Sequence, residues 1–135
     1  FSEKRFKGLM DFFGLPMNKP LRGFSTGQKN QFEVIMALCQ GADYILMDEP
    51  FAALDHFTRN QMQKELLKLQ QNSGTSILFV THSIDEALLL GHKIVIIEDG
   101  IIKKDYTIVK ESTERDLLSP AFIELKREII QELNL

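Results

Sequence analysis

Apolar residues recur at helical spacing through the first third of the chain. In the stretch 2–13 they stand three or four positions apart, and Gly14 follows as a stop, so the pattern predicts a helix. The stretch 15–24 contains prolines, asparagine and glycine, which predicts a loop. A second helix is predicted to begin at Ser25 and to end at Gly41. Its apolar residues leave little polar face, so we expect this helix to be mostly buried.

Short apolar runs then alternate with helical patterns. The runs 44–47 and 76–80 are short and continuous, as in strands that a fold covers on both faces. Between them, the stretch 58–71 has one apolar side and predicts an amphipathic helix. The stretch 83–86 has the spacing of a capping box, in which a serine and a glutamate satisfy N–H groups at a helix start. It predicts a short helix that stops at Gly91.

The last third of the chain predicts a hairpin and a terminal helix. A third apolar run, 93–97, is followed by Asp99-Gly100, so we expect 101–104 to pair back antiparallel. Ser119 followed by proline is a good helix start. An apolar stripe then follows, which we expect to pack on the protein itself; its members are Phe122, Leu125, Ile129 and Leu133. Because strands alternate with helices, the predicted fold class is α/β, with a mainly parallel sheet and an antiparallel hairpin.

Composition narrows the classes of protein. The chain has 135 residues, of which 44% are hydrophobic and 26% are charged, enough for one domain with a core. Its net charge of −3 does not favour a nucleic-acid-binding surface, so no nucleic-acid partner is expected. A single cysteine, Cys39, excludes an internal disulfide and is expected to be a small buried side chain. No apolar run approaches the roughly 20 residues of a membrane helix.

Polar side chains directly follow two of the predicted strands. Asp48 and Glu49 come after the first strand, and Thr81 and His82 come after the second. Ligands of parallel α/β sheets bind beyond the carboxyl ends of the strands, so these groups are candidates for a site. Adjacent carboxylates are tolerable there if a divalent cation neutralises one and the other accepts a proton or orients a water. Each feature also has an alternative without a ligand. Asp48 and Glu49 could belong to a solvated loop, and His82 could cap a helix or pack against neighbouring side chains.

The stretch GFSTGQ, residues 23–28, is a candidate anion site. Ser25 and Gln28 have the spacing of a capping box. Thr26 and Gly27 would leave backbone N–H groups free at the helix start, where the helix dipole favours anions such as phosphate. The alternative is a well-capped helix without a ligand.

Together these stretches resemble the nucleotide-binding domain of ABC transporters, over nearly the whole chain. Phe24–Gln28 is similar to the signature motif, usually LSGGQ, and Tyr44–Asp48 with Glu49 is similar to the Walker B strand and its catalytic glutamate. Ala53–Asp55 resembles the D-loop, and His82 stands where the switch histidine belongs. The order and spacing of these four motifs are together highly specific.

The resemblance implies a role for each motif. Asp48 would help to hold Mg²⁺, Glu49 would polarise the attacking water, and His82 would stabilise the charge that develops on the γ-phosphate of ATP. Asp55 would couple two half-sites across a dimer. The signature-like residues would cap the γ-phosphate of an ATP held by a second, facing ABC domain; they are Ser25, Thr26, Gly27 and Gln28.

The resemblance also implies partners, a location and a subgroup. The partners would be a second ABC ATPase domain, in a homodimer, and a transmembrane permease subunit; the chain would sit peripherally on the cytoplasmic face of the cell membrane. The stretches 81–97 and 119–130 resemble the ATPases of nitrate, sulfonate and taurine importers. Phe51 also favours an importer, because many exporters carry threonine there. The short stretch 14–24 is more like some exporter ATPases, so an exporter-type ATPase stays an alternative.

Parts of the family pattern are missing. The P-loop, G-x-x-x-x-G-K-[ST], is absent, because none of the eight glycines precedes a lysine. The adenine-stacking aromatic and the Q-loop glutamine are not found either. The P-loop strand, which the family places next to the switch-histidine strand, would be missing between 76–80 and 93–97, leaving backbone groups unpaired. We therefore expect the C-terminal part of a longer protein, which a start at Phe1 favours, or a truncated relative.

Alone, the chain is expected to bind ATP weakly and to hydrolyse it negligibly. Three residues depart from the family pattern and put full activity in doubt: Thr26 replaces a glycine, and Gln31 and Met36 replace arginines. The chain is predicted to comprise a signature-bearing helical part (1–41), an α/β core (42–110) and a C-terminal helical tail (111–135).

Two further functions compete with that of a transporter ATPase. A soluble, non-transport ABC ATPase, for example in DNA repair or translation, is disfavoured because the chain has no sustained heptads and no basic surface signal. A non-catalytic regulatory or interaction relic would explain the missing P-loop. Retention of Glu49 and His82 argues against a relic.

Overall fold

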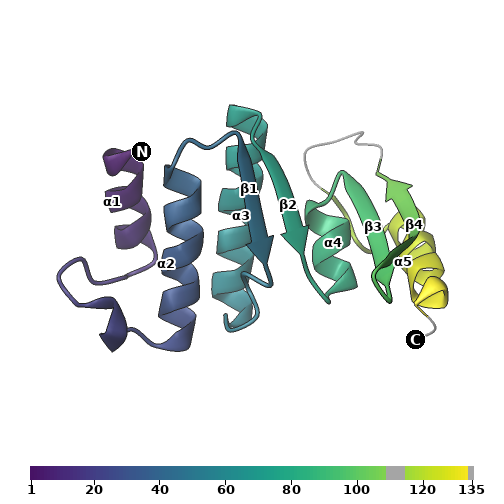
Figure 1. Cartoon of the computed structure of the whole chain (residues 1–135), viewed down its shortest axis with the longest axis horizontal. Helices are drawn as coiled ribbons and strands as arrows, with labels where there is room; N and C mark the ends of the chain where they lie inside the picture. The colour runs from purple at the N-terminus through teal and green to yellow at the C-terminus, as the bar shows by residue number, and fades with distance from the viewer. Residues whose placement is uncertain (109–114, 134–135) are drawn as a thin grey trace. The chain divides into compact units, whose positions relative to one another are not determined.

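The computed structural model describes residues 1–108 and 115–133. The chain divides into two compact units, Phe1–Val80 (unit 1) and Thr81–Leu135 (unit 2), and Figure 1 shows the elements of each. The predicted division into three parts stays a prediction, and its boundary near residue 110 lies outside the described residues. No helix in the described part is both long and apolar enough to cross a membrane.

Unit 1 follows the predicted order of elements. They are α1 (Glu3–Phe12), the 3-10 turn η1 (Leu21–Gly23), α2 (Thr26–Cys39), β1 (Tyr44–Asp48), α3 (His56–Ser73) and β2 (Ser76–Val80). α3 begins two residues earlier than predicted, because the Asp55 carboxylate accepts a hydrogen bond from the Thr58 N–H at 3.1 Å and caps the helix. It ends at Gly74, whose φ of +67° favours glycine.

Unit 2 contains the predicted short helix, hairpin and terminal helix. They are α4 (Ile84–Leu90), β3 (Lys93–Glu98), β4 (Ile101–Thr107) and α5 (Pro120–Glu132). Asp99 and Gly100 have φ angles of +51° and +76°, the left-handed pair that a tight two-residue hairpin needs. β4 continues beyond the predicted Lys104 to Thr107, which pairs with Lys93. Its polar residues concealed this extension, because they carry no apolar alternation.

The strands form two small sheets. β1 and β2 pair in parallel, in a register that runs from Tyr44 opposite Ser76 to Asp48 opposite Val80. β3 and β4 pair antiparallel. Within the described residues the sheets are β1–β2 in unit 1 and β3–β4 in unit 2. The α/β class, with a parallel pair and an antiparallel hairpin, is confirmed, and the lack of a strand between 76–80 and 93–97 stays a prediction.

One face of the β1–β2 sheet is buried and the other is bare. Met47 is only 6% exposed, whereas Tyr44 is 81%, Leu46 70% and Leu78 66% exposed. A pocket lined by Leu38 of α2, Ile45 of β1 and Leu69 of α3 shows that these three elements meet on the buried side. The prediction that both faces are covered is therefore wrong. Side chains alternate across a strand, and the helices of unit 1 cover a single face.

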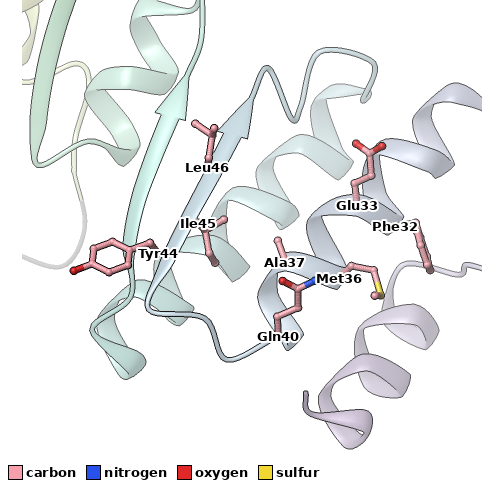
Figure 2. A pocket seen from close by; sticks show the side chains of 8 residues that line it. All are labelled: Phe32, Glu33, Met36, Ala37, Gln40, Tyr44, Ile45 and Leu46. Atoms are coloured by element: carbon pink, nitrogen blue, oxygen red, sulfur yellow. The ribbon is translucent and has the colours of Figure 1, made fainter.

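A hollow of about 330 Å³ lies between α2 and the first half of β1. Figure 2 shows the side chains that line it; they are Phe32, Glu33, Met36, Ala37, Gln40, Tyr44, Ile45 and Leu46. Met36, one of the residues that depart from the family pattern, is among them. The hollow includes neither the start of α2 nor the end of β1, so it is separate from the candidate site residues.

Because one sheet face is bare, substitutions at the adjacent β1 residues Leu46 and Met47 should have very different effects on stability. We expect Leu46→Gln to change the free energy of unfolding by no more than about 0.5 kcal/mol, because the side chain is already in water. Met47→Ala should cost about 2–4 kcal/mol, because it empties a buried site. Urea denaturation followed by circular dichroism measures both values. Equal losses in the two variants would show that the Leu46 face is covered in the folded chain.

The core of unit 2 lies around the hairpin and its two helices. Its buried members are Leu88, Ile94, Ile96, Ile108 and Ile129. The predicted stripe of α5 packs here: Ile129 is in the core, and Phe122, Leu125 and Leu133 pack against it. The Arg115 guanidinium donates hydrogen bonds of 2.6 Å to the carbonyls of Leu88 and Gly91, at the end of α4. The C-terminal stripe is thus confirmed as part of the fold.

Candidate functional site

The start of α2 is closed by the predicted capping box. The Ser25 hydroxyl accepts a hydrogen bond from the Gln28 N–H at 3.1 Å, and the Gln28 side-chain oxygen accepts one from the Ser25 N–H at 3.0 Å. Ser25 and Thr26 are exposed, and Gly27 and Gln28 are partly exposed. The first turn of this 14-residue helix therefore faces solvent, with the positive end of the helix dipole outermost.

Gly27 brings the start of α2 close to the loop after β1. A Cβ atom at Gly27 would lie 3.2 Å from the Ala53 carbonyl oxygen and 3.9 Å from the side chain of Leu54. Glycine allows this close approach, because a side chain would require the Ala53 backbone to move by a few tenths of an ångström. The structure thus brings two separate motifs together: the turn 25–28 and the loop 53–55.

The predicted acids stand at the end of β1. Asp48 is the last residue of the strand, is exposed, and is the register partner of Val80. The Glu49 N–H continues the ladder by donating to the Val80 carbonyl at 2.9 Å. Glu49 is partly exposed. Both carboxylates therefore leave the same end of the parallel pair, as the sequence predicted.

Glu49 has a strained backbone. Its φ is +45°, in the left-handed region that costs a non-glycine residue about 1–2 kcal/mol. Pro50 adds to the cost, since a residue before proline prefers extended conformations. Strain of this kind persists only where surrounding structure imposes it, and it clusters at functional sites. The observation singles out Glu49 more sharply than its adjacency to Asp48.

The strain predicts an inverted preference at position 49. Glu49→Gly should be more stable than Glu49→Ala by about 1 kcal/mol, because only glycine adopts a positive φ freely. At the exposed helical position Lys64 the order should be reversed, with alanine more stable than glycine by about 1 kcal/mol. Chemical denaturation of the four variants measures these differences. An alanine variant at position 49 as stable as the glycine variant would mean that this turn is relaxed.

A buried phenylalanine holds the loop that follows Glu49. The Leu54 N–H donates to the Phe51 carbonyl, and the Ala52 N–H to that of Glu49, both at 3.2 Å. Phe51 is 1% exposed, and its ring lies 5.5 Å, between centroids, from that of Phe79 on β2. The loop is therefore fastened to the sheet next to the exposed Asp48 and the partly exposed Glu49.

Asp55 has a visible local role. Its carboxylate caps α3, and the hydrogen bonds from Thr58 lower its pKa. A lowered pKa means that folding favours the charged carboxylate of Asp55. The stability that this cap contributes is therefore fully present above the pKa of an unfolded aspartate, and it is lost as the pH falls through the lower pKa of the folded state. The sequence missed this cap because Asp55 stands in a motif whose resemblance assigns another role.

His82 belongs to unit 2, two residues beyond the end of β2. Its side chain is exposed. The Ser83 hydroxyl caps α4 by accepting from the Glu86 N–H at 3.2 Å. The predicted capping box is only half right, however, because the Glu86 carboxylate accepts from the Thr81 hydroxyl at 2.8 Å. Convergence of His82 with Asp48 and Glu49 on one rim stays a prediction.

The carboxylates at the end of β1 fit a magnesium ion that is coordinated partly by the protein and partly by a bound phosphate compound. No group of three or more His, Cys, Asp or Glu side chains suited to a metal occurs in residues 1–108 and 115–133. Mg²⁺ is commonly bound through one or two carboxylates, with phosphates and waters completing its shell. Exposed Asp48 supplies such a carboxylate, with Glu49 beside it.

Comparisons with known proteins bear on these motifs. No protein-family model matches the chain. The taurine import ATP-binding protein TauB of Jannaschia sp. is 37% identical over 131 residues, covering 91% of this chain and 47% of that protein. The aliphatic sulfonates import ATP-binding protein SsuB 1 of Streptomyces avermitilis is 37% identical over 109 residues, covering 81% and 42%. A dimeric structure of the ATP-binding cassette MJ0796 bound to ADP and Pi matches with a TM-score of 0.70 and 26% identity, covering 82% of this chain and 50% of that one.

The chain belongs to the ABC ATP-binding proteins. It spans about half the length of the curated ABC relatives it matches, 42% and 47% in the two named. Similarity alone therefore does not establish that this chain has the activity of a whole ABC protein.

Three features of this ABC protein were not found from its sequence: the strain at Glu49, the approach of Gly27 to Ala53, and the hydrogen bond between Thr81 and Glu86. The proline after Glu49 was the available signal for the first, because it marks a forced turn. The other two depend on contacts between side chains and on packing between segments, which spacing does not reveal.

Proposed function

We propose that this chain is the motif-bearing C-terminal part of the ATP-binding subunit of an ABC importer of the nitrate, sulfonate and taurine type. The whole subunit binds and hydrolyses Mg-ATP and couples this to solute transport. It pairs with a second ATP-binding domain and with a permease subunit, peripherally on the cytoplasmic face of the membrane. The names of the sulfonate and taurine relatives support this subgroup.

The observation that carries the proposal is the strained Glu49 beside Asp48 at the end of a parallel strand. In the proposed site, Asp48 would hold Mg²⁺, which would supply positive charge to neutralise that of the phosphates. Glu49 orients the attacking water and accepts its proton. The outward start of α2 offers N–H groups and a positive dipole end to the phosphate of a facing subunit. His82 stabilises charge on the transferred phosphoryl group.

The strain also weighs against a non-catalytic relic. A left-handed glutamate before proline costs stability, and a chain released from catalysis would be free to replace it by glycine. Retained strain together with retained carboxylates favours a working site.

A chimera tests the proposed function. The 131 matched residues of the Jannaschia taurine relative are replaced by the corresponding residues of this chain, so that the relative supplies the rest of the subunit. We expect the purified chimera to hydrolyse Mg-ATP and to dimerise in its presence. The isolated 135-residue chain should show no micromolar ATP binding. A folded chimera that neither binds nor hydrolyses ATP would contradict the proposal, and so would micromolar binding by the isolated chain.

A further inference from the structure

The Thr81 hydroxyl has two partners in unit 2. It donates a hydrogen bond to a carboxylate oxygen of Glu86, with 2.8 Å between the oxygens. It accepts a hydrogen bond from the Ser83 N–H at 3.0 Å. The direction of each bond follows from chemistry, because an ionised carboxylate only accepts and a backbone N–H only donates. The Thr81 hydroxyl thus donates its proton to Glu86 and accepts the Ser83 N–H with an oxygen lone pair.

The bond from Ser83 closes a tight ring around His82. A threonine hydroxyl that accepts from the N–H two residues later forms a turn of its own, and the residue enclosed between them is His82. The ring restricts the backbone angles of His82, and these angles set the direction in which its exposed imidazole leaves the chain. The Thr81 hydroxyl therefore restrains the backbone that carries the imidazole.

The carboxylate of Glu86 accepts the proton of the hydroxyl that closes this ring. Glu86 is only 9% exposed, although burying a carboxylate is costly unless hydrogen bonds compensate. In an ordinary capping box this carboxylate would bond the N–H of the cap residue Ser83. Here the Thr81 hydroxyl lies between them and takes both bonds. The Ser83 hydroxyl completes the arrangement by accepting from the Glu86 N–H.

We infer that Glu86 is a positioning residue that acts through Thr81 to hold His82 in one orientation. The inference rests on the proposed function only in that His82 is the group presented to phosphate. The contacts are those of a short latch at the start of α4, defined by Thr81, Ser83 and Glu86. Without the hydrogen bonds of the latch, the imidazole of His82 is still present but is no longer held in one orientation.

The latch is tested by nuclear magnetic resonance on the full 135-residue chain, without nucleotide. Glu86→Ala and Thr81→Val should each shift and broaden the His82 imidazole signals and make the Ser83 amide exchange with solvent about fivefold to tenfold faster. Thr81→Ser and Glu86→Gln keep a hydroxyl and an acceptor, so they should restore signals close to those of the natural chain. Asp85→Ala is the matched control, since it removes an exposed carboxylate from the same helical turn.

The amide signals of Leu88 and Ile129 report whether unit 2 stays folded in each variant. If Glu86→Ala unfolds the unit, the pair Thr81→Val and Thr81→Ser decides, because valine keeps the shape of threonine and carries a methyl group in place of the hydroxyl. The inference is overturned if a folded Thr81→Val chain keeps its His82 signals and its Ser83 exchange rate. It is also overturned if Asp85→Ala disturbs His82 as much as Glu86→Ala does. None of these readouts uses ATP, so failure of the proposed function would leave them unaffected.

Discussion

Replacement of Phe51 by alanine is expected to lower the free energy of unfolding of unit 1 by about 3–5 kcal/mol. Phe51 is 1% exposed and its ring contacts that of Phe79, so the substitution removes a large apolar side chain and leaves a cavity in the core. The loss also reaches the site, because Phe51 fastens the loop that imposes the left-handed backbone on Glu49. Urea or thermal denaturation of the chain measures the effect.

Phe57 provides the matched control, because it is the same residue type six positions further along and is 71% exposed. Phe57→Ala should change stability by no more than about 0.5 kcal/mol. A small loss in Phe51→Ala, or equal losses in the two variants, would mean that the loop after β1 is not seated on the sheet. The strain at Glu49 would then lack the support that the fold gives it.

Replacement of Glu49 by glutamine in the chimera is expected to lower kcat for Mg-ATP hydrolysis by about 100-fold or more. The amide has nearly the shape of the carboxylate but accepts no proton from the attacking water. Binding of ATP should change little, because the proposed role of Glu49 lies in the chemical step and not in gripping phosphate. Steady-state hydrolysis and equilibrium ATP binding separate the two effects.

Glu128→Gln on the exposed side of α5 is the control for this chemistry. It makes the same change of charge and should leave kcat within about twofold, because surface substitutions away from a site have small effects. Undiminished hydrolysis in the Glu49→Gln chimera would remove Glu49 from the reaction. Lost ATP binding in that variant would instead assign the residue to the binding site.

Local chemistry explains why much of the candidate site was found before the fold. The box between Ser25 and Gln28 joins residues three apart, so it follows from spacing. Asp48 and Glu49 follow a short apolar run, which predicts both the strand and the exposed position of the acids at its end. The same reasoning failed for Glu86, because it assumed that the carboxylate would cap Ser83 and could not see the competing Thr81 hydroxyl.

The apolar runs of β1 and β2 show a different limit. A run apolar on both faces predicts a strand covered on both faces, yet Leu46 and Leu78 are exposed in the folded chain. The sequence records what each side chain prefers, and whether a helix is present to cover it depends on the elements that pack together. Here α2 and α3 meet β1 on one side.

By itself the sequence determined the order of helices and strands, the capping box of α2, the hairpin turn and the motifs of an ABC ATP-binding protein, because all of these depend on neighbours a few residues apart. Only the tertiary structure decided the left-handed backbone of Glu49, the contact of Gly27 with Ala53 and the bare face of the parallel sheet. The physical reason is the separation along the chain between the residues that interact. Caps and turns are closed by bonds within one or two helical turns of chain, whereas strain and burial are imposed by segments that meet only after folding.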